Sequence, residues 1–374
     1  MLQKKLTKNF NKVIPEIKAN IPIIFLSIFS ISITFYYGYR GVLPLDSFLI
    51  YDAGFKLSNG FHPFKDYWSI TGPVLDYFQF FFFKILGINW LSYVIHSAIV
   101  NFCLTVIFYN FLVKLGLSKT NSFIYSLSIA ILAYPSAGTP FMDHHAVIFS
   151  LISVLFTVLA FKNNRPIYWF FIPLFLFISF FSKQIPSAYL LVLITIFIFI
   201  YTLTLSQNSY KFFYFLFLGS ATSFFLFFLT IIFNNIPFNN FLTQYLFYPL
   251  EIGNNRGSNI SFDLNKIIFQ FKFIYFSLIP LIFISAIIAK NLKNFENKKD
   301  FMIIIFIIIT VIIFMYSQIM TKNQILIFFL IPFCLGVSNC YIKKYFDNKL
   351  LKSFVFFILV LATLKFHIRF NENK

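Results

Sequence analysis

Four carboxylic acids fall within one stretch near the start of the chain, residues 45–87, at Asp46, Asp52, Asp66 and Asp76. A carboxylate can take the proton from an attacking hydroxyl, and partial burial raises its pKa toward a useful value. Asp46 is our candidate for such a general base, although it is also well placed to cap a helix starting at SFLIYDAGF. Asp66 is a candidate for orienting a substrate, with pairing to the neighbouring lysine as the alternative. Asp52 is expected to be a solvated surface acid. For Asp76, a solvated surface acid and a functional residue both stay open.

A second group is the run Asp143-His144-His145 in YPSAGTPFMDHHAVIF. Three ionisable groups entering an apolar segment are costly, so a functional role is expected there. They could bind a donor phosphate, orient an acceptor, or hold a divalent ion together with Asp46. Adjacent residues on a helix point about 100° apart, which favours the wall of an active site over a metal site. Asp143 also fits the N-cap position of a helix.

Three cations form a third group near the ends of apolar segments: Lys183 in FFSKQIP, Arg256 in EIGNNRGSN and Lys322 in IMTKNQ. A cation beside a phosphate leaving group stabilises the charge that builds up in the transition state. The alternative is a side chain that extends from a helix end toward water. A functional role is favoured for Lys183 because Gln184 and Pro186 interrupt the apolar run there. For Arg256 and Lys322 both interpretations stay open.

The elements that must position these groups are apolar helices. The 374 residues are 59% hydrophobic and 11% charged, whereas soluble domains are about 25% charged. The net charge of +18 lies mainly in short linkers, which is typical of membrane topology rather than of nucleic-acid binding. The three cysteines have no metal-binding spacing. We therefore predict an all-α integral membrane protein, a single polytopic bundle over residues 1–374 with interfacial helices in its first long loop.

About eleven apolar stretches approach the ~20 residues needed to cross a bilayer. They are residues 21–39, 90–113, 121–136, 145–161, 166–182, 187–205, 211–234, 267–289, 301–320, 324–341 and 351–367. With the N-terminus in the cytoplasm, 18 of the 30 Lys and Arg residues fall on cytoplasmic segments and 8 of the 12 acids on the other side. This distribution follows the positive-inside rule. The long loops 40–89 and 235–265 would then face the periplasm or the cell exterior.

The first long loop resembles that of the GT-C superfamily of membrane glycosyltransferases, in the branch of protein mannosyltransferases, aminoarabinose transferases and lipopolysaccharide-core sugar transferases. The resemblance covers about 45 residues and rests on Asp46, Tyr51, Ala53, Gly60, Asp66, Gly72-Pro73 and Lys84-Ile85-Leu86-Gly87. Many relatives carry a second acid directly after the first, where this chain has Ser47. This difference weakens the case for a paired-acid site at that position.

The resemblance implies a glycosyltransferase that takes a sugar from a polyprenyl-phosphate donor and passes it, usually with inversion, to an acceptor hydroxyl on the outer face. It implies Asp46 as the general base. The expected partners are that donor, a glycan, lipid or protein acceptor, and membrane lipids, but no nucleic acid. The cell (inner) membrane is the expected location. No cofactor is certain, and a divalent cation at Asp46 and Asp143 stays an open alternative.

Two other functions stay open. A transporter or flippase of lipid-linked saccharides would be expected to show internal repeats and broken helices near mid-bilayer. The first loop has no obvious repeat in the second half, and the polar residues gather at one membrane face. An O-antigen polymerase or ligase would be expected to have a large late outer loop, whereas residues 235–265 form only a modest one.

Overall fold

The computed structural model describes residues 2–41, 48–205, 209–258, 265–321 and 326–372. Within these ranges the chain forms helices and no strands. The helices are α1 (Leu2–Arg40), α2 (Leu49–Ser58), α3 (Pro73–Leu86), α4 (Trp90–Lys114), α5 (Lys119–Ala133), α6 (Met142–Asn163), α7 (Pro166–Ser182), α8 (Gln184–Thr204), α9 (Ser209–Phe233), α10 (Phe238–Phe241), the π-helix η1 (Leu242–Phe247), α11 (Tyr248–Ser258), the π-helix η2 (Asn265–Phe269), α12 (Lys272–Ala289), α13 (Phe295–Thr321), α14 (Leu330–Tyr345) and α15 (Lys349–Asn371).

Eight of these helices are long and apolar enough to cross a membrane: α1 from Asn20 onward, α4, α6, α8, α9 from Lys211 onward, α12, α13 and α15. The prediction of an all-α protein with membrane-spanning helices is confirmed at this level. The other three predicted spans, 121–136, 166–182 and 324–341, fall on α5, α7 and α14, which have only 15, 17 and 16 residues. Helix length therefore supports eight spans directly, against the eleven predicted.

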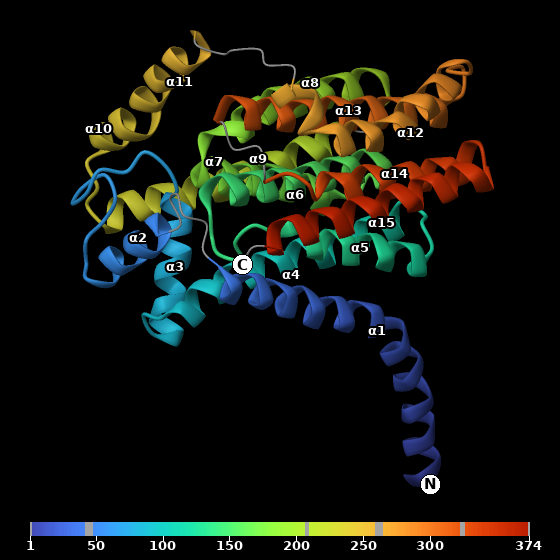
Figure 1. Ribbon diagram of the computed structural model, residues 1–374, viewed down its shortest axis with the longest axis horizontal. Coiled ribbons are helices and arrows are strands. Elements are labelled where there is room, and N and C mark those ends of the chain that lie inside the picture. Colours follow the sequence, from blue (N-terminus) through green and yellow to red (C-terminus); the bar gives the residue numbers. More distant parts are fainter. Residues whose placement is uncertain (1, 42–47, 206–208, 259–264, 322–325, 373–374) are drawn as a thin grey trace.

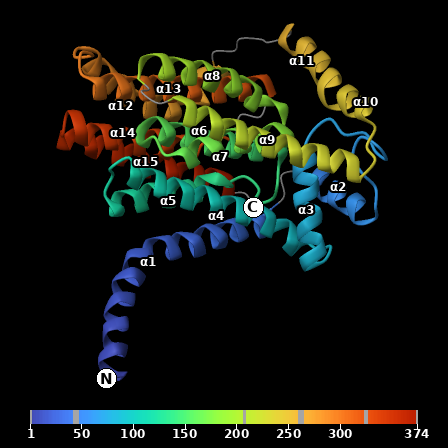
Figure 2. The same ribbon diagram turned by 180° about the vertical axis from the view of Figure 1, so that it is seen from behind.

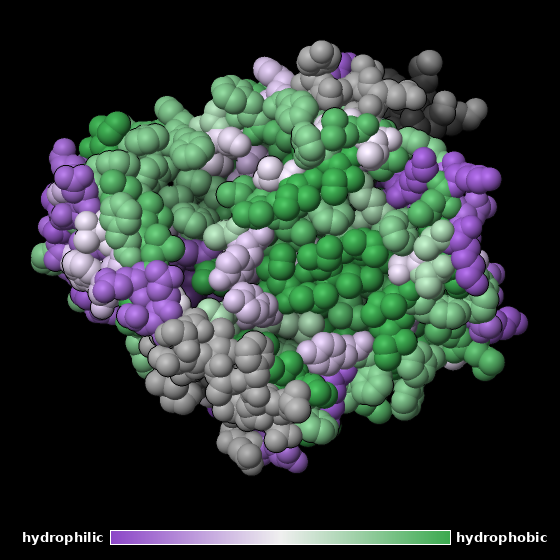
Figure 3. Space-filling view, turned by 90° about the horizontal axis from the view of Figure 1, so that it is seen from above, coloured by the Kyte–Doolittle hydropathy of each residue, from purple (hydrophilic) through white to green (hydrophobic). Residues whose placement is uncertain are grey.

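The long helices lie side by side, and the short ones gather at one end of the bundle (Figures 1 and 2). α2, α3, α10 and α11 lie at that end, while the α12–α13 and α14–α15 turns lie at the other. Figure 3 shows a broad hydrophobic surface with hydrophilic side chains gathered at its two sides. This distribution matches a bundle whose middle lies in hydrocarbon.

α6 is the centre of the bundle, because nearly all of its apolar span is buried, whereas little of the α9 span is buried. Small polar residues join α6 to α7: the Ser150 and Ser179 hydroxyls lie 2.7 Å apart, and Ser153 donates to the Ile172 carbonyl at 2.9 Å. Such hydrogen bonds hold helices together where no hydrophobic driving force acts between them. On the other side of α7, Gly219 of α9 lies so close that a Cβ would come 2.2 Å from the Phe170 carbonyl oxygen.

Caps and breakers set the helix boundaries. Asn89 accepts a hydrogen bond from the Ser92 backbone N–H at 2.9 Å at the start of α4, and Asn348 does the same for Leu351 at 3.1 Å at the start of α15. Pro73 occupies the first turn of α3, where its missing N–H is no loss. The extended backbone of Lys183 separates α7 from α8. These boundaries place several charged side chains at the end of the bundle that carries the short helices.

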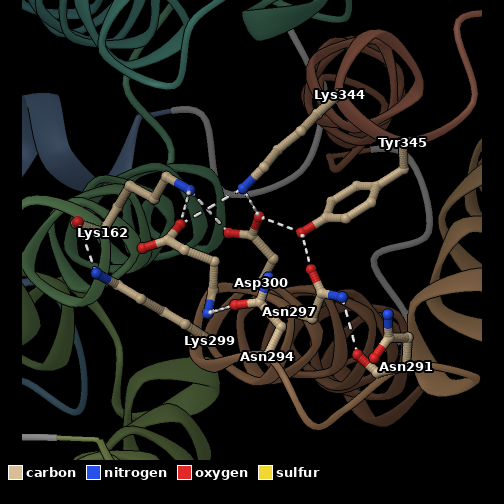
Figure 4. A network of polar contacts seen from close by, with 9 residues as sticks. Lys162, Asn291, Asn294, Asn297, Lys299, Asp300, Lys344 and Tyr345 are labelled. Atoms are coloured by element: carbon tan, nitrogen blue, oxygen red, sulfur yellow. Dashed lines mark hydrogen bonds and ion pairs between the residues drawn. The ribbon is translucent and has the colours of Figure 1, made fainter.

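A buried carboxylate also joins three helices at the opposite end (Figure 4). The Asp300 carboxylate of α13, fully buried, accepts hydrogen bonds from Lys162 of α6 at 2.8 Å, Lys344 of α14 at 2.5 Å and the Tyr345 hydroxyl at 2.8 Å. Lys299 donates to the Lys162 carbonyl at 3.0 Å. From the sequence these lysines counted only as basic linker residues, and nothing in their spacing predicts a shared acid.

Candidate functional site

A cavity of about 960 Å³ lies at the end of the bundle that carries the short helices. Its walls come from α2, from residues 67–71, and from the first residues of α6 and α8. Most of residues 245–254 of η1 and α11, the last residues of α13, Asp76 of α3 and Phe180 of α7 also line the cavity. The cavity therefore adjoins both long loops and the ends of several long apolar helices.

Asp143 and Lys183 form an ion pair inside this cavity. Asp143 is the second residue of α6, and Lys183 lies in the extended break between α7 and α8. Their side chains are only 5% and 18% exposed, so water screens the pair weakly. From the sequence they belonged to two separate groups, the acid-histidine run and the isolated cations. Because Lys183 keeps some contact with the cavity, its ammonium could bind an anion such as a phosphate that enters there.

Asp76 is a second buried acid of the cavity, 4% exposed. Gly72, with φ of 76°, and Pro73 start α3 so that this carboxyl turns inward, where the Tyr67 hydroxyl donates to it at 3.3 Å. Burial raises the pKa of Asp76 well above its usual range, and burial together with this acid raises the pKa of Tyr67. A carboxyl with a raised pKa is suited to act as a proton donor or acceptor.

The sequence left Asp76 open between a surface and a site residue. The available signal was its setting, since an acid inside the apolar helix PVLDYFQFFFF has few ways to stay solvated. The structure therefore adds Asp76 to the site residues that we had predicted.

Asp52 and Lys56 of α2 also line the cavity, as an ion pair of 2.7 Å one helical turn apart. Their side chains are 55% and 40% exposed, so the pair is solvated, as predicted for Asp52. Exposed pairs of this spacing contribute only about 0.3–0.5 kcal/mol. The cavity thus has one solvated ion pair and one buried ion pair.

Hydrogen bonds hold the two long loops together over the cavity. The Gln184 side chain, at the start of α8, donates to the carbonyls of Ile70 and Tyr245, each at 2.8 Å. The Ser69 backbone N–H donates to the Gln244 side chain at 2.9 Å. One polar residue beside Lys183 therefore binds both loops, which fixes the walls of the cavity relative to the buried ion pair.

Three predicted site residues lie away from the cavity lining. Asp66 accepts a hydrogen bond from the His62 backbone N–H at 2.8 Å and so closes a turn. His144 and His145 are buried in the bundle, where the ring of His144 packs on Tyr134 at 4.4 Å and His145 lies 3.2 Å from the Tyr134 hydroxyl. The structure thus brings Asp143 and Lys183 together in the cavity, whereas Asp66, His144 and His145 do not line it.

Asp46 and Lys322 lie outside the described residues, and so does the side chain of Arg256. Among the residues that the structure describes, no group of three or more His, Cys, Asp or Glu side chains could hold a metal ion. A metal site that uses Asp46 with Asp143 therefore stays a prediction.

Comparisons with family models, with curated proteins and with solved structures gave no match for this chain.

Proposed function

We propose that this protein is a membrane glycosyltransferase that transfers a sugar from a polyprenyl-phosphate donor to an acceptor hydroxyl. The observation that carries the proposal is the cavity, where the buried Asp143–Lys183 pair lies beside residues of the first long loop and the ends of long apolar helices. The resemblance of the first loop to GT-C glycosyltransferases supports the same activity. The proposal includes about eleven spans, a cytoplasmic N-terminus and a cavity on the outer face of the cell membrane.

The proposed reaction is a displacement at the anomeric carbon. Asp46 takes the proton of the acceptor hydroxyl, the hydroxyl oxygen forms a bond to that carbon, and the carbon–oxygen bond to the phosphate breaks with inversion. Polyprenyl phosphate leaves with the bonding electron pair. Lys183 stabilises the negative charge that grows on the phosphate, and Asp143 holds the lysine in position.

The donor's apolar tail would lie beside α8 and α13. Both helices are of membrane-spanning length, and both contribute residues to the cavity, among them Ala188 and Thr321. A lipid-linked donor could then bring its phosphate to Lys183 while its tail stays in hydrocarbon. The raised pKa of Asp76 supports a role in handling the acceptor, because its protonated carboxyl can donate a hydrogen bond to a sugar oxygen.

The test is turnover of polyprenyl-phosphate sugars by the purified protein in lipid nanodiscs, measured as acceptor-dependent release of polyprenyl phosphate. We expect Asp46→Asn to lower the rate by about 10²–10⁴ and Lys183→Met by about 10²–10³. Lys84→Met is the matched control, because Lys84 lies in the last turn of α3 and does not line the cavity.

Full activity of folded Asp46→Asn and Lys183→Met would refute the assigned roles. Binding of the donor without release, unchanged in Asp46→Asn, would instead favour transport of a lipid-linked saccharide.

A further inference from the structure

A second cavity, of about 630 Å³, lies between α5, α14 and α15. Its lining includes Ser118, the N-cap of α5, together with Lys343 and Lys352. It does not belong to the proposed sugar-transfer site. Lys344 and Tyr345, which directly follow Lys343, contact Asp300 in the early turns of α13, whereas the last residues of α13 line the first cavity. The two cavities therefore lie at opposite ends of the bundle.

One rim of this second cavity is cationic. The segment 343–352 holds Lys343, Lys344, Lys349 and Lys352 against Asp347. Because Lys344 pairs with Asp300, three positive charges minus one negative remain, a net charge of +2. Within the described part of the chain, Lys343 is exposed and has no carboxylate within ion-pair distance. Lys352 pairs with Asp347, whose side chain is 72% exposed. An anion at the rim would therefore meet the Lys343 ammonium, which lies beyond ion-pair distance of the described carboxylates, and the Lys352 ammonium, which is held only by a solvated pair.

The other wall is apolar and continues down the bundle. Phe356, Phe357 and Val360 of α15 line the cavity and are 46%, 62% and 39% exposed. Val360 follows the two adjacent phenylalanines by three and four residues, one turn along a helix of membrane-spanning length. A small soluble anion would use the rim and leave this wall uncovered. A ligand with a negatively charged head and an apolar chain would cover both.

We propose that this cavity binds one anionic phospholipid, with its phosphate headgroup between Lys343 and Lys352 and an acyl chain along Phe356, Phe357 and Val360. The side chains of Asn121 and Asn339 add polar groups to the same lining. This site is independent of sugar transfer, and the combination of a basic rim with an apolar wall at a helix end is what lipid headgroup recognition requires. Zwitterionic lipids would bind less well, because their own ammonium group opposes the two lysines.

The experiment is native mass spectrometry of the full-length protein in detergent, titrated with phosphatidylglycerol or with phosphatidylcholine. We expect one phosphatidylglycerol to bind ahead of any further lipid, and more tightly than phosphatidylcholine. Lys343→Gln and Lys352→Gln should each weaken this first binding by about fivefold, and together by about thirtyfold. Ser353→Trp, which fills the cavity without changing its charge, should also prevent it.

The matched control is the double variant Lys293→Gln, Lys298→Gln, which removes two exposed charges from the α12–α13 turn and early α13, away from the cavity lining. It should leave the first binding unchanged. Equal losses in the two double variants, or no loss in Lys343→Gln, Lys352→Gln, would overturn the proposal. Competition by glycerol phosphate as strong as that by the intact lipid would also overturn it, because the cavity would then bind a soluble phosphate.

Discussion

Replacing one residue of the buried Asp143–Lys183 pair should destabilise the protein more than replacing both residues together. Lys183→Met leaves a carboxylate only 5% exposed without its cation, for which we expect a loss of about 3 kcal/mol. Asp143→Asn leaves an ammonium that is 18% exposed and still reaches the cavity, so the expected loss is about 1–2 kcal/mol. The double variant leaves no unpaired charge, and its loss should be about 1 kcal/mol. The coupling between the two positions is then about 3 kcal/mol.

The assay is thermal unfolding of the four proteins in lipid nanodiscs at one pH and one scan rate. At about 2 °C per kcal/mol, Lys183→Met should lower the Tm by about 6 °C and the double variant by about 2 °C. Asp52→Asn and Lys56→Met are the matched control, because the same residue types form an exposed pair there, and each change should shift the Tm by about 1 °C or less. If the double variant lost the sum of the two single losses, the pair would be uncoupled and our reasoning about its burial would be refuted.

Two further predictions concern positions around the same site. Burial raises the pKa of Asp76, with Tyr67, Lys56 and Asp52 as its polar surroundings, so the folded state keeps a proton that the unfolded state releases above about pH 4. Stability should therefore fall as pH rises from about 4 toward the raised pKa, by up to about 1.4 kcal/mol per unit. Asp76→Asn is neutral at every pH and should remove this dependence of stability on pH. Thermal unfolding at pH 5, 6.5 and 8 measures it. If the Tm of the two proteins changed with pH in parallel, the prediction would be contradicted. Gly138→Ala should cost at least about 3 kcal/mol, because φ is 63° and a Cβ would lie 2.2 Å from the Gly38 nitrogen. Gly60→Ala is the control for the backbone strain alone, because Gly60 has φ of 84° but nothing lies within 4 Å of an added Cβ. An equal loss of Tm in both variants would show that the contact of the Cβ added at position 138 with Gly38 does not destabilise the protein.

The class of the protein and the positions of its helices follow from the order of its residues alone. A run of apolar residues becomes a helix in hydrocarbon because every backbone N–H and C=O must find a partner within the segment. For this reason the eleven predicted spans all fall on helices, although only eight are long enough to cross a membrane by themselves. The shortfall lies in three shorter helices: α5 ends at Ala133, α7 ends at Ser182 where Lys183 takes an extended backbone, and α14 begins only at Leu330.

The sequence also identified Asp143 and Lys183 as unusual, because a charge beside apolar residues is costly wherever it lies. That argument depends only on neighbours along the chain. It therefore also selected His144 and His145, which the fold buries away from the cavity, and it left Asp76 undecided.

The pairing of the charged residues, by contrast, depends on how the helices pack. Asp143 meets Lys183 across 40 positions of sequence, and Lys162 meets Asp300 across 138. Residue type and periodicity report the environment of each group, but the partner depends on which helices pack together and on the rotation of each about its axis. A rotation by one residue, about 100°, would turn Asp76 away from the cavity. The sequence therefore determined where polar groups were unusual, and helix packing decided which of them share one site.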